Sequence, residues 1–216
     1  MRIGLFGGTF DPVHHGHLRS ALELRDVLAL DVVRLLPNHL PGHRGPTGAD
    51  PAQRLAMLEA SVGDVPGLQV DDRELQRAGP TYTVDTLESL ARECPGAELV
   101  FCLGVDAFDD FLEWHRPERI LALAHLVVIE RPGAQLSAPA EALVARQARQ
   151  VGPTLSHARQ GVIERRALTR LEISATRIRR DVAAGRDVRF LLTEPARAYI
   201  LEHRLYGAVS DPIVGS

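Results

Sequence analysis

Residues 2–18 read RIGLFGGTFDPVHHGHL, and the fold is decided from this stretch onward. A short apolar run leads into Gly7-Gly8 and then into a polar loop that contains Asp11-Pro12. Two histidines, His14 and His17, follow as a helical pattern begins. Glycine lets backbone approach a ligand closely, and proline ends the strand. Because a helix start offers free N–H groups and the positive end of its dipole, the stretch predicts an anion site between a first strand and a first helix.

The composition is that of a globular protein without a broad affinity for nucleic acid. The 216 residues, 45% of them hydrophobic and 25% charged, fit one α/β domain with a buried core. A formal net charge of −3 provides no positive excess for tracking nucleic-acid phosphates. All 25 basic residues apart from histidine are arginine, so any cationic contact to a phosphate must use arginine or histidine.

Cysteine usage and hydropathy favour a reducing compartment and no membrane. Cys94 and Cys102 form neither a metal-binding pair nor a disulfide framework. No apolar run approaches the ~18 residues of a membrane span, and the chain opens directly on a strand pattern rather than on a signal peptide. We therefore expect a cytoplasmic protein, either a monomer or a homo-oligomer.

Strand and helix patterns alternate along the chain. The expected strands are Ile3–Phe6, Val32–Leu36, Leu68–Val70, Leu99–Leu103 and Leu126–Ile129. The expected helices are His15–Leu28, Pro51–Ala60, Thr83–Arg92 and Ala138–Gln150. Such alternation predicts right-handed crossovers and an α/β, Rossmann-like, doubly wound and mainly parallel sheet, with ligands beyond the carboxyl ends of its strands.

The carboxyl-terminal part of the chain is expected to belong to the same unit. We expect a single domain over 1–216, in which about 165–216 forms a small helical extension that completes the site. The charged run Glu164-Arg165-Arg166 just before it reads as solvated surface.

A second candidate anion site lies in that extension, at Ile173-Ser174-Ala175-Thr176-Arg177-Ile178-Arg179. Ser174 is a good helix cap, and Thr176 falls in the first turn of the helix that follows. Taken alone, this is more often an ordinary capped helix. Two anion-receiving helix starts in one small domain, with Arg177 and Arg179 beside the second, suit a triphosphate.

These motifs make the chain resemble the bacterial nicotinate mononucleotide adenylyltransferases, within the nucleotidyltransferases that carry a His-x-Gly-His signature. The resemblance rests on five ordered motifs that span nearly the whole chain: 7–17, 72–86, Gly104-Val105-Asp106 with Trp114, 173–179, and a closing run of Val188, Tyr199-Ile200 and Leu205-Tyr206. Two motifs depart from the family pattern, the first of which is commonly Pro-Pro-His-Lys. Arg44 in Pro41-Gly42-His43-Arg44 replaces a lysine, and Ala175 replaces a serine.

The resemblance implies transfer of AMP from ATP to nicotinate mononucleotide, by direct in-line attack without a covalent enzyme intermediate. It implies catalytic roles for His14, His17 and Arg179, and Mg²⁺ held by substrate phosphates rather than by a protein metal site. The ATP-binding residues it implies are Gly7, Gly8, Thr9, Phe10, His14, His17, Gly104, Asp106, Ile173, Ser174, Thr176, Arg177 and Arg179. The implied mononucleotide-binding residues are Arg44, Thr81, Tyr82, Thr83 and Trp114.

Several alternatives stay open at this point. Trp114 could be a core residue rather than a partner of the pyridine ring, and Thr83 and Asp106 could be helix caps. The histidine pair could bind zinc, although no third ligand is suitably spaced. Within the same chemistry, the chain could prefer nicotinamide mononucleotide or a phosphopantetheine. A nucleotide sensor without catalysis and a hydrolase are the alternatives from other classes, and no Gly-x-Ser-x-Gly elbow supports the hydrolase.

Overall fold

The core of the protein is a parallel sheet with the strand order β3-β2-β1-β4-β5-β6. The computed structural model describes residues 1–39, 47–77, 79–131, 133–151, 154–155 and 161–208. The strands are β1 (Arg2–Gly8), β2 (Val32–Pro37), β3 (Leu68–Val70), β4 (Glu98–Gly104), β5 (His125–Ile129) and β6 (Ile163–Arg166). This is the doubly wound, Rossmann-like α/β arrangement that the sequence predicted.

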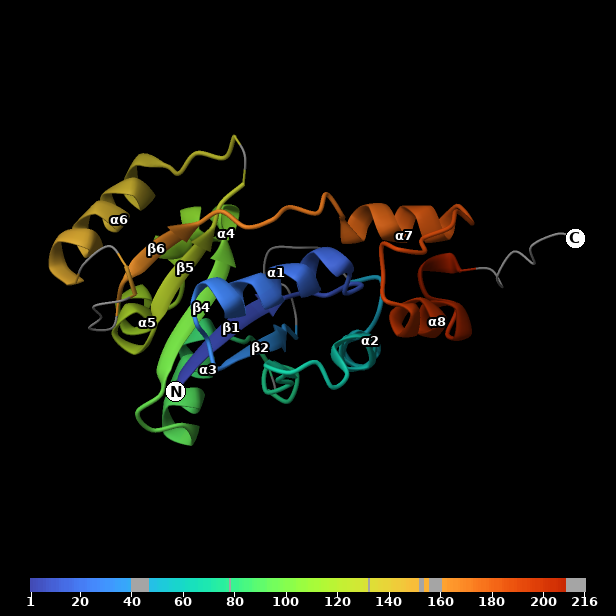
Figure 1. Ribbon diagram of the computed structural model, residues 1–216, viewed down its shortest axis with the longest axis horizontal. Coiled ribbons are helices and arrows are strands. Elements are labelled where there is room, and N and C mark those ends of the chain that lie inside the picture. Colours follow the sequence, from blue (N-terminus) through green and yellow to red (C-terminus); the bar gives the residue numbers. More distant parts are fainter. Residues whose placement is uncertain (40–46, 78, 132, 152–153, 156–160, 209–216) are drawn as a thin grey trace, which may run out of the picture.

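Helices cover both faces of the sheet (Figure 1). Helices α1 (His15–Val27) and α2 (Pro51–Val62) cover one face, and α7 (Ala175–Ala183) and α8 (Glu194–Glu202) extend the same hydrophobic cluster past the end of the sheet, where α8 packs against α2 (Figure 1). Those of the other face are α3 (Thr83–Glu93), α4 (Val105–Asp109), α5 (Pro117–Leu123) and α6 (Ala138–Val151). Figure 1 shows α7 and α8 together at one end of the molecule, with α6 at the other end. None of the helices in the described part of the chain is long and apolar enough to cross a membrane.

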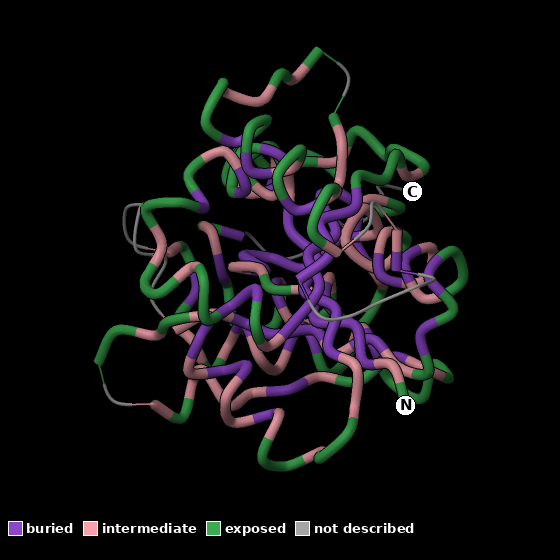
Figure 2. The backbone as a smooth tube through the Cα atoms, turned by 90° about the vertical axis from the view of Figure 1, so that its left-hand side faces the viewer, coloured by how far each residue is buried: buried purple, intermediate pink, exposed green. Residues whose placement is uncertain are grey.

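Strand β4 shows why both faces must be covered. Its side chains alternate, so that Val100 and Cys102 pack with the α1 and α2 face while Leu99, Phe101 and Leu103 pack with the α3 face. A strand that is apolar on both sides can be stable only between two helical layers. Figure 2 shows the result, with the buried backbone gathered in the middle of the molecule and exposed segments around it.

The structure contains elements that the sequence analysis missed. Strand β6 extends the sheet at its edge, and Glu164 within it is 5% exposed, accepts the Leu155 N–H at 2.8 Å and pairs with Arg166. The expectation that this charged run is solvated surface is therefore wrong for Glu164. The short helices α4 and α5 and the 3₁₀ turn Phe111–Glu113 were also missed, because segments this short show no clear helical period.

A buried arginine on α2 holds the carboxyl ends of β1 and β2 in place. Arg54 has an exposed fraction of 0%, and its guanidinium donates to the carbonyl oxygens of Thr9 at 2.6 Å, Asn38 at 2.8 Å and His39 at 3.1 Å. These carbonyls belong to loops that leave the sheet and lack strand partners. One planar guanidinium therefore supplies hydrogen bonds to carbonyl groups in the loops that follow two neighbouring strands.

Replacement of this arginine should destabilise the whole fold. We expect Arg54→Met to lower the free energy of unfolding by about 2–4 kcal/mol, because it leaves buried carbonyl groups without donors. Urea unfolding followed by circular dichroism measures the change. Arg19→Met on α1 is the matched control, since the Arg19 side chain is 49% exposed. Equal unfolding midpoints for the two variants would contradict this role of Arg54.

Candidate active site

The strand order defines where a ligand can bind. The order reverses between β1 and β4, which lie side by side in the centre of the sheet. From the carboxyl end of β1 the chain crosses to α1 on one face, and from β4 it passes directly into α4 on the other. Open parallel sheets bind ligands at such a point because the two loops diverge there. The predicted site residues of the loop after β1 thus lie at the same edge of the sheet as Gly104 and Asp106, which follow β4.

Two stacked histidines form the centre of this edge. His14 occupies the N-cap of α1 and His17 lies in its first turn, and their rings are 3.6 Å apart at an interplanar angle of 20°. The Phe10 ring contacts His17 edge-on, with centroids 5.1 Å apart. A Cβ on Gly16, between the histidines, would lie 3.0 Å from His14 Nδ1, so a larger residue there would push on the imidazole. Within the described residues, the buried Nδ1 atoms of both histidines have no hydrogen-bond partner.

Both imidazoles are neutral near pH 7. Burial lowers the pKa of His14 to about 4; the backbone of His14 itself acts in the opposite direction, and the neighbouring His15 lowers the pKa slightly further. Burial lowers the pKa of His17 well below its usual range, and so does its proximity to His14. An anion that contacts these rings would favour their charged form and supply a partner to buried nitrogen atoms. The pair is thus suited to receive negative charge.

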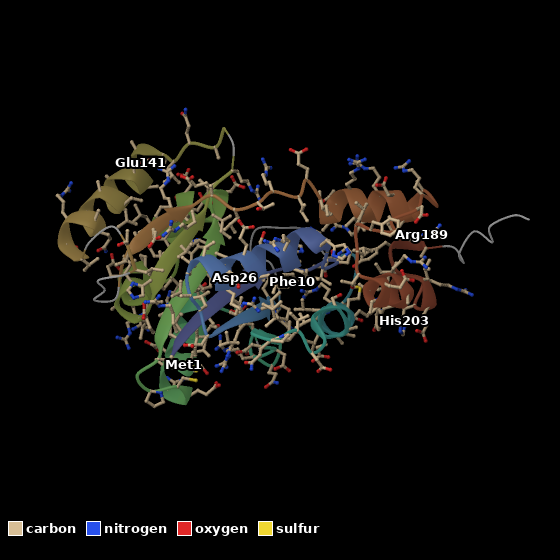
Figure 3. The ribbon with its side chains drawn as sticks, viewed as in Figure 1. Met1, Phe10, Asp26, Glu141, Arg189 and His203 are labelled. Carbon is tan, nitrogen blue, oxygen red and sulfur yellow. The ribbon has the colours of Figure 1, made fainter. Side chains whose placement is uncertain are left out.

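The glycines and the phenylalanine before the histidines differ in part from expectation. Strand β1 continues through Gly7 and Gly8 instead of breaking at them. A Cβ on Gly8 would lie 2.9 Å from the Phe10 ring, so the ring requires glycine at this position. Phe10 is 1% exposed and lies in the interior beside α1 (Figure 3). Any contact of Phe10 with a ligand would therefore use its backbone.

The second predicted helix start is present, but its serine does not cap it. Ser174 occupies the N-cap of α7, yet its side chain makes no capping hydrogen bond. The hydroxyl-bearing residues Ser174 and Thr176 are both exposed. At the first helix start, by contrast, the N–H of His15 donates to the carbonyl oxygen of Leu191 at 3.1 Å. Part of the expected anion site on α1 is thus occupied by the chain itself.

The two arginines of α7 have different surroundings. Arg179 donates to the carbonyl oxygen of Asp11 at 2.6 Å, which brings it to the loop that precedes His14. Arg177 is 75% exposed and lies 3.6 Å from Asp181 on its own helix. The structure therefore brings Arg179 to the histidine loop and leaves Arg177 at the surface. Arg44, the third arginine predicted to contact phosphate, lies outside the described residues.

A second group of aromatic residues lies near the start of α3. Trp114 is half-buried and packs edge-on against Phe101, with centroids 6.1 Å apart. Tyr82 is 44% exposed and its ring lies 4.5 Å from that of His115. His115 was not among the predicted site residues, although it directly follows Trp114. The Trp114 ring also lies 5.6 Å from that of Phe111, so it packs against the core while the residue remains partly exposed.

The turn before α3 is anchored by a buried polar group. Thr86 donates its hydroxyl hydrogen to Glu74 at 2.8 Å and accepts from Arg77, also at 2.8 Å. Burial raises the pKa of Glu74, while the Thr86 hydroxyl and Arg77 act in the opposite direction. Tyr82, not Thr83, occupies the N-cap of α3, so the alternative of a Thr83 cap is wrong. The segment that contains Thr81 and Tyr82 is thus held against α3.

A groove lies beside Asp106, at the carboxyl ends of β5 and β6. Its volume is about 330 Å³, and it is lined in part by Val105, Arg131, Arg165, Leu168 and Arg170. Arg131 donates to the Asp106 carboxylate at 2.6 Å across the loop ends. Asp106 lies in the first turn of α4 and Gly104 is the N-cap, so Asp106 is not a cap. The lining arginines were not predicted as site residues, since isolated arginines in a sequence usually mark surface.

Known proteins are similar to this chain over nearly its whole length. Residues 5–181 match the family model described as cytidylyltransferase-like. A protein of Cellvibrio japonicus named as a probable nicotinate-nucleotide adenylyltransferase is 48% identical over 94% of this chain and 98% of its own. A Pseudomonas aeruginosa protein of the same name is 48% identical over 96% of this chain and 98% of its own.

Solved structures show the same fold at low sequence identity. The nicotinic acid mononucleotide adenylyltransferase of Plasmodium falciparum, solved in complex with NaAD, superposes with a TM-score of 0.73. The superposition covers 96% of this chain and 98% of the Plasmodium chain. At 16% sequence identity, this similarity supports the fold alone. With a family model matched over most of its length and full-length relatives at nearly half identity, the chain belongs to the nicotinate-nucleotide adenylyltransferases, a family of cytidylyltransferase-like nucleotidyltransferases.

Proposed function

We propose that this protein transfers AMP from ATP to nicotinate mononucleotide, giving nicotinate adenine dinucleotide and pyrophosphate in NAD biosynthesis. The observation that carries the proposal is the stacked pair His14 and His17 at the point where the strand order reverses. Two neutral imidazoles whose buried Nδ1 atoms have no hydrogen-bond partner among the described residues suit an incoming phosphate chain and not a core packing role. The reducing cytoplasm remains the proposed setting, as the composition favours.

The reaction requires no general base. A phosphate oxygen of the mononucleotide attacks the α-phosphorus of ATP, the new P–O bond forms, and the bond from that phosphorus to the bridging oxygen breaks as pyrophosphate leaves. The nucleophile is already an anion, so the protein must align two repelling anions and offset charge at the transferring phosphorus. His14 and His17 would donate hydrogen bonds to the triphosphate, and the pKa of each ring would rise as the anion arrives.

The arginines and a metal ion would share the remaining phosphate charge. Arg179, next to the histidine loop, would contact the reacting phosphates, and Arg44 and Arg177 would share the phosphate charge. No cluster of three or more His, Cys, Asp or Glu that could hold a metal ion occurs within the described residues. The donors at the site are mostly cationic or neutral, which fits Mg²⁺ that arrives with ATP and neutralises charge from the phosphates themselves.

The two substrates would occupy different halves of the edge. The ATP half would comprise the end of β1, the start of α7 and the groove beside Asp106, with Gly7, Gly8, Thr9, Phe10, Gly104, Ile173, Ser174 and Thr176 as contacts. The mononucleotide half would comprise Arg44, the turn Thr81–Thr83 and Trp114. The Trp114 ring would stack on the pyridine ring, and backbone donors of the turn would bind the nicotinate carboxylate.

The proposed activity is tested by offering the two possible acceptors separately. We expect pyrophosphate release from ATP with nicotinate mononucleotide, and slower release with nicotinamide mononucleotide, which lacks the carboxylate. An enzyme-coupled pyrophosphate assay and chromatography of the dinucleotide measure both. Release with neither acceptor, or ATP hydrolysis without an acceptor, would contradict the proposal.

Loss of one donor at the reacting phosphorus should slow turnover without unfolding the protein. We expect His17→Ala to lower kcat by roughly 100-fold or more, as for other preorganised donors at a developing charge. The matched control is His15→Ala in the same helical turn, which keeps the backbone bond to Leu191 and should retain wild-type kcat. A folded His17→Ala protein with full activity would refute the assignment.

Removal of the tryptophan ring should weaken one substrate selectively. We expect Trp114→Ala to weaken binding of nicotinate mononucleotide by about 5- to 10-fold, the contribution of one aromatic contact, and to leave ATP binding nearly unchanged. Isothermal titration calorimetry with each substrate measures both affinities. Leu112→Ala is the control, because Leu112 is 44% exposed in the neighbouring 3₁₀ turn. Equal weakening of both substrates would indicate a purely structural role for Trp114.

A further inference from the structure

The loop that leads to His14 contains a buried carboxylate with an unusual set of partners. Asp11 is 5% exposed. One of its oxygens, Oδ2, accepts the Gly48 N–H at 2.8 Å, and the other, Oδ1, accepts the Ala49 N–H at 3.1 Å. The hydroxyl of Tyr206 donates to Oδ1 at 2.8 Å. A buried carboxylate is stable only when donors surround it, and here one donor comes from nearly the other end of the chain.

The position of Tyr206 is specified by the structure around it. Its backbone is in the left-handed region, with φ 58° and ψ 22°, which side chains of L-residues rarely adopt. A Cβ on Gly48 would lie 2.8 Å from the Tyr206 ring and 3.1 Å from Cδ of Arg179. Burial and the Asp11 carboxylate raise the pKa of Tyr206, so that its hydroxyl stays protonated and remains a donor. The ring is thus held closely against the residues that Asp11 binds.

The same aspartate also holds the arginine of the proposed site. Arg179 Nη1 donates to the Asp11 carbonyl oxygen at 2.6 Å and lies 3.5 Å from the carboxylate oxygen Oδ2. The Arg179 side chain is 32% exposed, so it is not fixed by burial alone. The guanidinium is held by the Asp11 carbonyl oxygen, by the Asp11 carboxylate and by the Thr176 hydroxyl, to which Nη2 donates at 3.3 Å. The Tyr206 hydroxyl donates to Oδ1, and the other carboxylate oxygen, Oδ2, faces the arginine.

We propose that Tyr206 is a positioning residue for phosphoryl transfer, whose hydroxyl orients the Asp11 carboxylate and through it Arg179. Tyr206 touches no reacting atom in this arrangement. Its contribution is to hold the Arg179 guanidinium where it can contact the phosphates in the transition state. The proposal rests on the proposed function, because the readout is the rate of AMP transfer.

Removal of the hydroxyl alone tests the proposal. Tyr206→Phe keeps the ring against Gly48 and loses the bond to Asp11. We expect kcat to fall about 10-fold with KM for both substrates nearly unchanged, because misplacement of a transition-state contact affects kcat. Tyr199→Phe on α8 is the matched control, since the Tyr199 ring packs against His203, tilted by 32° with centroids 4.0 Å apart. We expect it to retain wild-type kcat.

A double-mutant cycle with Arg179→Ala separates positioning from general destabilisation. If the hydroxyl acts through Asp11 on the arginine, Tyr206→Phe should lower kcat much less in the Arg179→Ala background than in the wild type. All rates are compared at a temperature at which urea unfolding shows each variant to be folded. Unchanged kcat in Tyr206→Phe, a loss that the unfolded fraction alone explains, or additive losses in the cycle would each overturn the proposal. An inactive wild-type protein would instead refute the proposed function.

Discussion

The buried carboxylate of Asp11 is the constraint on which the rest of the structure depends. Its two oxygens accept hydrogen bonds from the Gly48 and Ala49 N–H groups and from Tyr206, and Arg179 lies beside it. A charge removed from water must be compensated by donors, so segments far apart in the chain have to meet at this point. The segment before α2, helix α7 and the carboxyl-terminal turn are thereby fixed around the loop that follows β1.

This constraint gives the site its two-sided construction. The sheet places the loops of β1 and β4 at the edge where the strand order reverses, and α7 and α8 return to that edge from the end of the chain (Figures 1 and 3). The neutral histidines lie on the sheet side, and Arg179 comes from the returning helix. A site for two mutually repelling substrates benefits from this construction, because donors from independent elements can surround a single phosphorus.

The parts of the fold that could be predicted from sequence are those with strong local signals. The buried strands are apolar runs bounded by glycine or proline, and α2 begins with the capping box of Asp50 and Gln53, so their bounds were predicted closely. Strand β6 carries Glu164, Arg165 and Arg166 and has no such signal, since Glu164 pairs with Arg166 and the other partners of these charges, among them Leu155 and Glu141, lie in other segments. Arg54 gave no sign of burial either, because only the loop carbonyls of two other segments make its burial favourable.

The sequence by itself determined the doubly wound α/β fold, the histidine pair at the first helix start and the second helix start near Ser174. Each of these depends on backbone chemistry and periodicity within a short window, which a sequence displays directly. Only the tertiary structure decided that Arg179 faces Asp11, that Tyr206 reaches the same carboxylate and that Leu191 takes up the His15 N–H. Those contacts join residues more than 150 positions apart, and their energy comes from burying polar groups together, which no local pattern records.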